Sequence, residues 1–145
     1  MHRFALAFVL TAACGGAVSQ IEVKGRDPDL AAVAGDWQGK YQGTDNPRSG
    51  EIRFSLELGM HTGEGQVLMT GATKPLAIEF IAVKANQISG SIQPYTEPSC
   101  ACQVHTEFVG TLEGNEIDGT FITKVAAKGT EMHGTWQVAR DSAGT

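Results

Sequence analysis

The chain has 145 residues, of which 41% are apolar and 19% charged, and its formal net charge is −5. This length suits one domain after removal of a leader and is too short for two domains. Because 11 Lys and Arg stand against 16 Asp and Glu with no basic cluster, the composition argues against nucleic acid or anionic lipid headgroups as partners held by charge. The 18 glycines favour short strands and many turns over long helices.

The chain opens with the pattern of an export signal. Residues 1–3 supply a positive charge, residues 4–10 are apolar, and residues 11–13 are small. A charged start, an apolar run and small residues before a cleavage site are typical of a secretory signal peptide. The run is too short for a membrane span, which needs about 20 apolar residues. We therefore predict a signal peptide over residues 1–13.

The residues that end this segment, Leu10-Thr11-Ala12-Ala13-Cys14, resemble a bacterial lipobox and depart from it at Thr11. The resemblance implies that Cys14 is diacylated and becomes the N-terminus, so that a lipid bilayer is a partner and acyl chains give a firm anchor. It also implies a cell-envelope location. With Gly15 after the cysteine, this would be the periplasmic side of the outer membrane in a bacterium with two membranes. The alternative is plain secretion, with cleavage after Ala17-Val18-Ser19.

Residues 14–26 are predicted to be a lipidated tether, and residues 27–145 a β-barrel domain. The domain begins with a short helix over Asp27–Gly35. Asp27 is expected to cap its free N–H groups, and Pro28 fits the first helical position, where no N–H is needed. Gly35 is expected to end the helix in a left-handed conformation.

After Gly35 the apolar residues follow a period of two. In one segment Ile52, Phe54 and Leu56 share a face while Arg53 and Ser55 share the other. One-sided alternation is typical of antiparallel sheets with one face in a core. The pattern predicts eight strands: Asp36–Thr44, Glu51–Leu58, Gln66–Thr70, Leu76–Lys84, Gln87–Ile92, Gln103–Leu112, Glu116–Thr123 and Met132–Arg140.

Two predicted hairpins repeat one another. Residues 86–92 match residues 115–121 by residue type, each with a turn Asn, an inward Ile, an inward Gly and an inward large apolar residue. An inward glycine lets a strand coil sharply or lets another group approach its backbone. Repeated around a sheet, this device closes a barrel. The predicted fold is therefore all-β: an eight-stranded antiparallel up-and-down barrel preceded by one short helix.

The helical turn that leads into Gly35-Asp36-Trp37 resembles the Gly-x-Trp opening of lipocalins and their calycin relatives. The resemblance implies that Trp37 packs at a closed barrel end beneath Arg140. The chain is shorter than true lipocalins, lacks their Thr-Asp-Tyr loop signature, and has no residue set that matches the avidin biotin site. It looks like a small exported bacterial lipoprotein with a lipocalin-like barrel.

The interior of such a barrel is either filled by side chains or holds one small ligand. The residues expected to line it are Trp37, Tyr41, Phe54, Phe108, Phe121 and Trp136. We expect an apolar cavity, open at the end that bears the loops of His61 and Cys100, and hence a membrane-anchored protein that binds a small apolar ligand. The alternative is a filled barrel that contacts another protein through outward apolar residues. These residues are expected to be Ile81, Val83, Val109 and Ile122.

Cys100, Cys102 and His105 form the one dense group of soft metal ligands in the sequence. An exported compartment is oxidising, which favours a disulfide between the two cysteines, although extended residues two apart hold their β-carbons too far apart for an S–S bond. Free thiols and a copper or zinc site are the alternatives, and the expected outward direction of His105 argues against a metal. The sequence shows no catalytic motif, so we expect neither an enzyme nor a cofactor.

Overall fold

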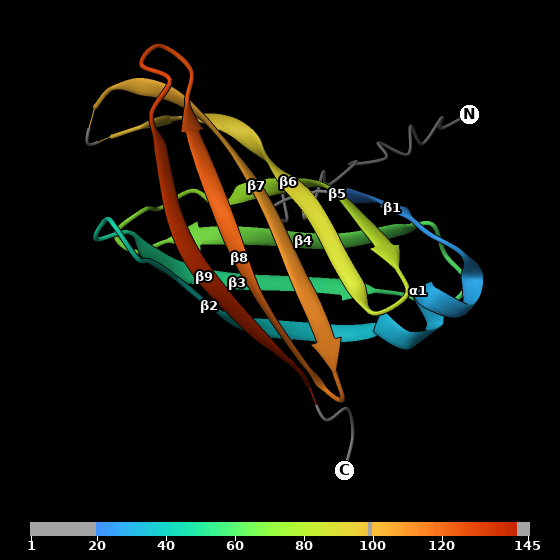
Figure 1. Cartoon of the computed structure of the whole chain (residues 1–145). Helices are drawn as coiled ribbons and strands as arrows, with labels where there is room; N and C mark the ends of the chain where they lie inside the picture. Colours follow the sequence, from blue (N-terminus) through green and yellow to red (C-terminus); the bar gives the residue numbers. More distant parts are fainter. Residues whose placement is uncertain (1–19, 99, 142–145) are drawn as a thin grey trace, which may run out of the picture.

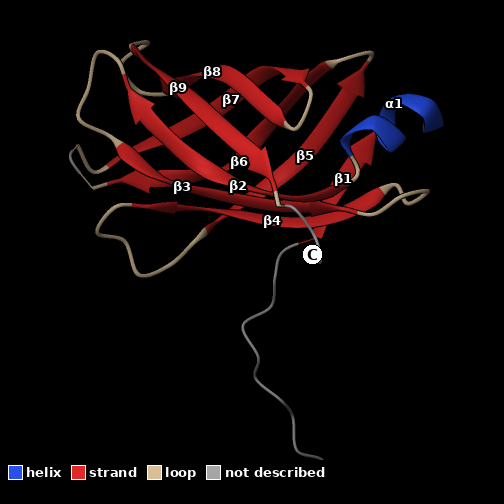
Figure 2. Ribbon diagram, turned by 90° about the horizontal axis from the view of Figure 1, so that it is seen from below, coloured by secondary structure: helices blue, strands red, loops and turns tan. Residues whose placement is uncertain are grey.

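The computed structural model describes residues 20–98 and 100–141, and in this part of the chain nine strands form one closed barrel with a short helix at one end (Figures 1 and 2). The predicted signal peptide and Cys14 lie outside the described residues. The elements are β1 (Gln20–Lys24), α1 (Asp27–Val33), β2 (Gly35–Gly43), β3 (Ser49–Leu56), β4 (Thr62–Met69), β5 (Leu76–Lys84), β6 (Gln87–Glu97), β7 (Cys102–Glu113), β8 (Glu116–Val125) and β9 (Glu131–Arg140).

The strands from β2 to β9 follow an up-and-down order, in which each pairs antiparallel with the next one along the chain. β2 and β9 then pair antiparallel, from Trp37 opposite Arg140 to Gly43 opposite Gly134, and close the barrel. The predicted all-β barrel with one short helix is confirmed. The prediction of eight strands, all antiparallel, is wrong, because the barrel has a ninth strand and one parallel pairing.

The additional strand is β1, which lies between β4 and β5. β1 pairs antiparallel with β4 and parallel with β5, and β4 and β5 pair directly only through Gln66 and Val67 with Ala77 and Leu76. Ile21 and Val23 of β1 are buried in the core. The sequence predicts a tether over residues 14–26, and its last part is instead a strand of the barrel wall. The alternation of apolar and charged residues in Gln20–Lys24 explains why this segment fits there.

The helix α1 lies across the end of the barrel at which β5 ends and β6 begins (Figures 1 and 2). Leu30 and Val33 are its buried residues, and they join the barrel core. The expected caps are not the observed ones. Arg26 stands at the N-cap position in place of Asp27 and makes no side-chain cap bond, and the helix ends at Val33 with Ala34 as its C-cap residue. Gly35 is instead the first residue of β2.

A register shift in β5 between Ile78 and Phe80 changes which of its residues face the core. After the shift, Ile81 and Val83 are 1% and 4% exposed, so the prediction that they point outward is wrong. An extra residue in one strand reverses the inward and outward positions that follow it. Val109 and Ile122, which lie on β7 and β8, are exposed as expected.

The loops divide between the two barrel ends. The connections 57–61, 85–86 and 114–115 share the end that carries α1, and His61 lies 3.5 Å from Asp27 of this helix. The connections 44–48, 70–75 and 126–130 lie at the opposite end, which we call the mouth, and so do residues 98, 100 and 101 between β6 and β7. The prediction that the loops of His61 and Cys100 share one end is therefore wrong, because strands of an up-and-down barrel place alternate loops at opposite ends.

Candidate functional site

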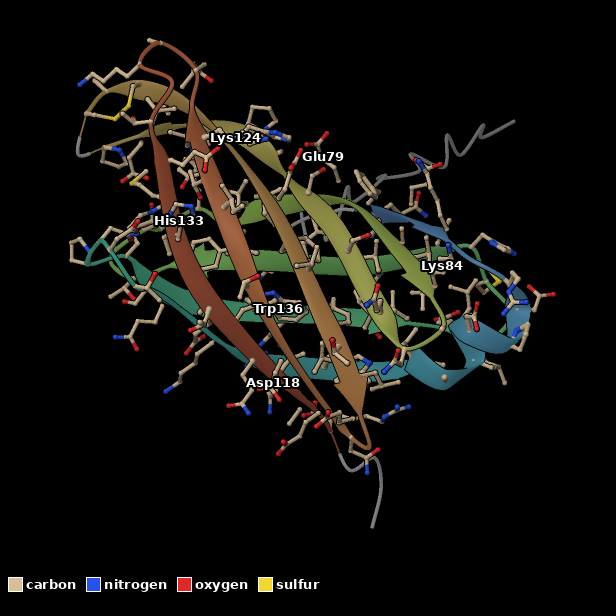
Figure 3. The ribbon with its side chains drawn as sticks, in the orientation of Figure 1. Glu79, Lys84, Asp118, Lys124, His133 and Trp136 are labelled. Atoms are coloured by element: carbon tan, nitrogen blue, oxygen red, sulfur yellow. A yellow bond between two sulfur atoms is a disulfide. The ribbon has the colours of Figure 1, made fainter. Side chains whose placement is uncertain are left out.

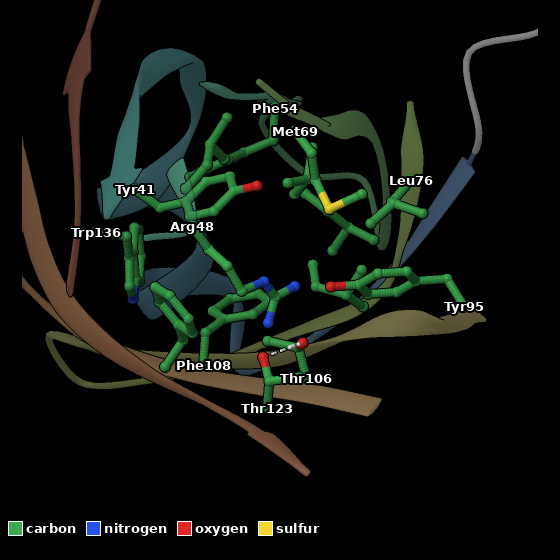
Figure 4. A pocket seen from close by; sticks show the side chains of 15 residues that line it. Tyr41, Arg48, Phe54, Met69, Leu76, Tyr95, Thr106, Phe108, Thr123 and Trp136 are labelled. Atoms are coloured by element: carbon green, nitrogen blue, oxygen red, sulfur yellow. Dashed lines mark hydrogen bonds between the residues drawn. The ribbon is translucent and has the colours of Figure 1, made fainter. Parts of the chain in front are cut away.

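The barrel contains a cavity of about 60 Å³ with an almost wholly apolar lining (Figure 4). Its lining residues come from β2 to β9 and the connection between β2 and β3: Tyr41, Arg48, Ile52, Phe54, Val67, Met69, Leu76, Ile78, Ile92, Tyr95, Thr106, Phe108, Phe121, Thr123 and Trp136. A space for one water molecule needs only about 10–15 Å³. The cavity therefore has room for more than one water, although apolar walls offer water few partners.

The cavity lies toward the mouth of the barrel. Arg48 precedes β3 at this end, Met69 ends β4, Leu76 begins β5, and Tyr95 lies near the end of β6. These four side chains are partly exposed, in contrast to the fully buried residues near α1. The cavity thus lies at the barrel end that carries the Cys100 loop, and the His61 loop lies at the other end.

Five of the six residues expected to line the interior lie around this cavity: Tyr41, Phe54, Phe108, Phe121 and Trp136. Trp37 does not, because it lies deeper, at the closed end. It is 1% exposed, and its Nε1 donates a hydrogen bond to the carbonyl oxygen of Val33, 2.9 Å away. The Cζ atom of Arg140 lies 4.6 Å from the centre of the Trp37 ring, which is the stacking that the lipocalin resemblance implies.

Arg140 also closes the C-terminal end of α1. Its Nη2 donates a hydrogen bond to the carbonyl oxygen of Ala32 at 2.8 Å, and its Nη1 donates another to that of Ala34. The last carbonyl groups of a helix lack partners within the helix. Arg140 therefore holds the helix, the Trp37 ring and the end of β9 together.

The inward glycines make room for aromatic rings rather than for a ligand. A methyl group at Gly119 would meet the carbonyl oxygen of Val109 and the indole of Trp136, and one at Gly134 would meet the ring of Phe121. Gly90 faces Phe108 in the same way. Trp136 is fixed over its glycine, because its Nε1 donates to the carbonyl oxygen of Val109 at 3.0 Å. An enlarged residue at Gly119 would therefore test the fold and not the cavity.

Arg48 is a polar residue of the cavity that sequence reasoning missed. It lies in the connection between β2 and β3, its side chain is 13% exposed, and its Nη2 lies 3.3 Å from a carboxylate oxygen of Glu97. The Tyr95 hydroxyl donates to the same oxygen at 3.1 Å. No sequence pattern singles out Arg48, because it lies in a connection. Its partner Glu97 lies beyond the predicted end of this strand at Ile92, since a proline within a run argues against a strand and Pro94 follows. β6 accommodates this residue with a register shift between Ile92 and Tyr95.

Two further sets of hydroxyl groups border the cavity. Burial raises the pKa of Tyr41 to about 12, so this phenol stays protonated and remains a hydrogen-bond donor. The hydroxyls of Thr106 and Thr123 bond to each other at 2.7 Å across β7 and β8. The cavity thus combines an apolar wall with a few convergent polar groups, which is typical of small-molecule sites.

The connection that carries Arg48 is fastened to β9. His133 lies on β9 (Figure 3), and its Nδ1 is 2.9 Å from a carboxylate oxygen of Asp45, while the Asn46 amide donates to its carbonyl oxygen at 3.0 Å. Hydrogen bonds with His133 hold the pKa of the Asp45 carboxyl well below its usual range. Hydrogen bonding to Asp45 in turn raises the pKa of His133, and Glu131 at 3.4 Å acts in the same direction.

The sulfur atoms of Cys100 and Cys102 are in close contact in the loop between β6 and β7. Ala101 has a φ of 51°, and this turn brings the two Cα atoms to 5.2 Å, within the range that disulfides span. The expected geometric obstacle is absent because the segment is not extended. His105 lies on the outer face 3.6 Å from Glu79, and no group of three or more potential metal ligands occurs in residues 20–98 and 100–141.

No model of a known protein family and no curated protein matches this chain. The barrel is thus assigned from its strands and register alone. Within the described residues, no helix has the length and apolar character needed to cross a membrane.

Proposed function

We propose that this protein is a cell-envelope binding protein that holds a small apolar ligand in its barrel. The observation that carries the proposal is the apolar cavity at the mouth, with the opposite end closed by α1 and the Trp37–Arg140 contact. A cavity of about 60 Å³ is smaller than the roughly 150 Å³ that holds benzene, so we expect a slender ligand that extends out through the mouth. Binding is proposed rather than catalysis, because the sequence carries no catalytic motif.

A slender neutral apolar dye such as diphenylhexatriene tests the cavity. We expect saturable binding with enhanced fluorescence, because apolar surface leaves water on entry. Val67→Phe should abolish binding, since Val67 lines the cavity and a larger ring would fill it. Val109→Phe is the matched control, because Val109 is 55% exposed on the outer face. Unchanged binding to Val67→Phe would contradict the proposal.

Anchoring through Cys14 is the second part of the proposal, and it is supported by the lipobox-like residues 10–14. Mass spectrometry of the mature protein should find an acylated N-terminal cysteine. Cys14→Ser should move the protein from the membrane fraction to the soluble fraction. An unmodified chain that begins at Gln20 would contradict lipidation and favour plain secretion.

The proposed relation to lipocalins and other calycins rests on Gly35-Asp36-Trp37 and on the contact between Arg140 and the Trp37 ring.

We also propose that Cys100 and Cys102 form a disulfide in the mature protein, which their close contact supports. Alkylation of the unfolded chain should modify neither cysteine before reduction and both after it. Modification of both without reduction would show free thiols. The serine variant of Cys102 supplies the mass reference for one free thiol.

The second candidate function is a protein-interaction module, which the exposed Val109 and Ile122 on neighbouring strands favour. This candidate predicts that dye binding is absent, and that Val109→Lys weakens association with another envelope component without a change in stability. Saturable dye binding that Val67→Phe removes would favour the cavity instead.

A further inference from the structure

Arg48 has nitrogen atoms that the protein itself does not use. Its Nε and Nη1 are buried, and neither has a hydrogen-bond partner among the described residues. Its Nη2 is engaged by Glu97 at 3.3 Å, and its Cζ lies 5.6 Å from the centre of the Tyr95 ring. A buried donor without an acceptor costs about 1–3 kcal/mol, and more when it is charged. The unused N–H groups are therefore available to an acceptor from outside the chain, which is a water molecule or a ligand.

The direction of the side chain points to where this acceptor would lie. Figure 4 shows the guanidinium of Arg48 extending into the ring of lining side chains, with the hydroxyl of Tyr41 directed into the same space. No other described residue accepts a hydrogen bond from the Tyr41 hydroxyl, and its raised pKa keeps it a donor at neutral pH. The space between these groups thus receives donors from two sides.

We propose that the ligand is a small amphiphile with a carboxylate head, which accepts hydrogen bonds from a free N–H group of Arg48 and from the hydroxyl of Tyr41. Its apolar chain occupies the cavity lined by residues of β2 to β9. This inference rests on the proposed binding function and names the ligand class for the same cavity.

A carboxylate fits these donors better than other head groups. It is acceptor-only, and hydrogen bonds with an ionised partner are about twice as strong as neutral ones. An ammonium head would bring a second positive charge beside Arg48. Glu97 does not occupy the free nitrogens, because it meets Arg48 through Nη2 and accepts from Tyr95 at the same oxygen. The ligand carboxylate would accept from another nitrogen, so that the guanidinium of Arg48 would be shared between it and Glu97.

Calorimetric titration with octanoate, methyl octanoate, octanol and octylamine at neutral pH tests the head group, because the apolar chain is constant. We expect octanoate to bind at least about tenfold more tightly than the ester or the alcohol, which corresponds to about 1.4 kcal/mol. Octylamine should bind most weakly. If the four compounds bind equally, or octylamine binds best, the head-group inference is overturned while the cavity function stands. If none binds and the apolar dye also fails, the proposed function itself is wrong.

Two variants locate the effect. Arg48→Met with Glu97→Gln removes both charges together, so no buried charge is left alone, and it should reduce octanoate affinity to that of the ester while ester binding is retained. Tyr41→Phe removes one hydroxyl without a change in ring packing, and it should weaken octanoate several-fold and leave the ester unaffected. Equal loss of both ligands in Tyr41→Phe, or undiminished octanoate binding in the folded double variant, would contradict the assignment of these donors.

Discussion

Gly119 and Trp136 show how a single missing side chain shapes the interior. The Trp136 ring lies where a Cβ of Gly119 would project, and the same Cβ would meet the carbonyl oxygen of Val109. We predict that Gly119→Ala lowers the free energy of unfolding by about 1–3 kcal/mol, because overpacking against backbone cannot be relieved by a rotamer change. Thr120→Ala is the control, since Thr120 points outward, and its change should stay within about 0.5 kcal/mol. Denaturant unfolding measures both, and equal effects would contradict the packing argument.

His133 gives a second prediction at the level of one side chain. Its pKa is raised by the hydrogen bond to Asp45, so its protonated form stabilises the folded state. This stabilisation is fully present below the ordinary pKa of about 6.5 and is lost as the pH rises through the raised value. The lowered pKa of Asp45 sets the acid limit, where its own contribution is lost as the pH falls.

We therefore predict that His133→Gln is most destabilising in weakly acidic solution, and that its difference from the unsubstituted protein shrinks in alkaline solution. Thermal unfolding across this pH range measures the difference, and proton NMR of His133 measures its pKa directly. His61→Gln is a suitable control. A His133 pKa at or below its ordinary value would contradict the interpretation.

Among the strands, β1 is the one whose removal would open the wall. It fills the gap between β4 and β5 at the end near α1, and its Ile21 is 0% exposed. We predict that Ile21→Ala lowers the free energy of unfolding by about 2–5 kcal/mol, as large-to-small substitutions in a core do. Glu22→Ala, on the exposed face of the same strand, should change it by less than about 0.5 kcal/mol. Similar effects of the two would show that β1 detaches easily.

The elements differ in how far the sequence could predict them. The period of two locates every strand from β2 to β9, because each has one buried face, and β5 matches its predicted bounds of Leu76–Lys84. β1 has only five residues and two inward apolar side chains, too few for a periodic signal to separate it from a tether. The shift in β5 reverses Ile81 and Val83, and the residue types do not locate it, because both faces of this strand carry apolar residues. Alternation of residue types indicates which side chains of a strand face the core, whereas a bulge depends on how the strand pairs with its partner.

The sequence could likewise predict some residues of the candidate site and not others. Aromatic residues at inward positions identify five lining side chains, since direction follows from alternation. Alternation could not predict that Arg48 lines the cavity, because this residue lies in a connection between strands. Its partner Glu97 is also distant in the sequence. The inward glycines suggested open space in the barrel, but aromatic rings of neighbouring strands cover Gly90, Gly119 and Gly134. The sequence does not show which ring covers which glycine.

The barrel as a whole carries an arginine at each end, and the surroundings of the two arginines differ. At the closed end Arg140 stacks on Trp37, two of its nitrogens donate to carbonyl oxygens of the α1 terminus, and its Nε alone is buried without a partner in the described chain. At the mouth Arg48 retains two nitrogens without partners in the described chain. The first arrangement consolidates the fold, and the second leaves binding capacity.

We predict that Arg140→Met lowers the free energy of unfolding by about 1.5–3 kcal/mol, the contribution of a hydrogen bond to a charged group. Its affinity for the apolar dye should be unchanged at temperatures where it is folded. Arg48→Met with Glu97→Gln should show the reverse pattern, with little loss of stability and a loss of octanoate affinity, because replacing both members of a buried ion pair is often neutral. Denaturant unfolding and calorimetry on the same two variants measure both quantities. Loss of dye binding in folded Arg140→Met would contradict this division, since it would mean that the closed end also sets the shape of the cavity.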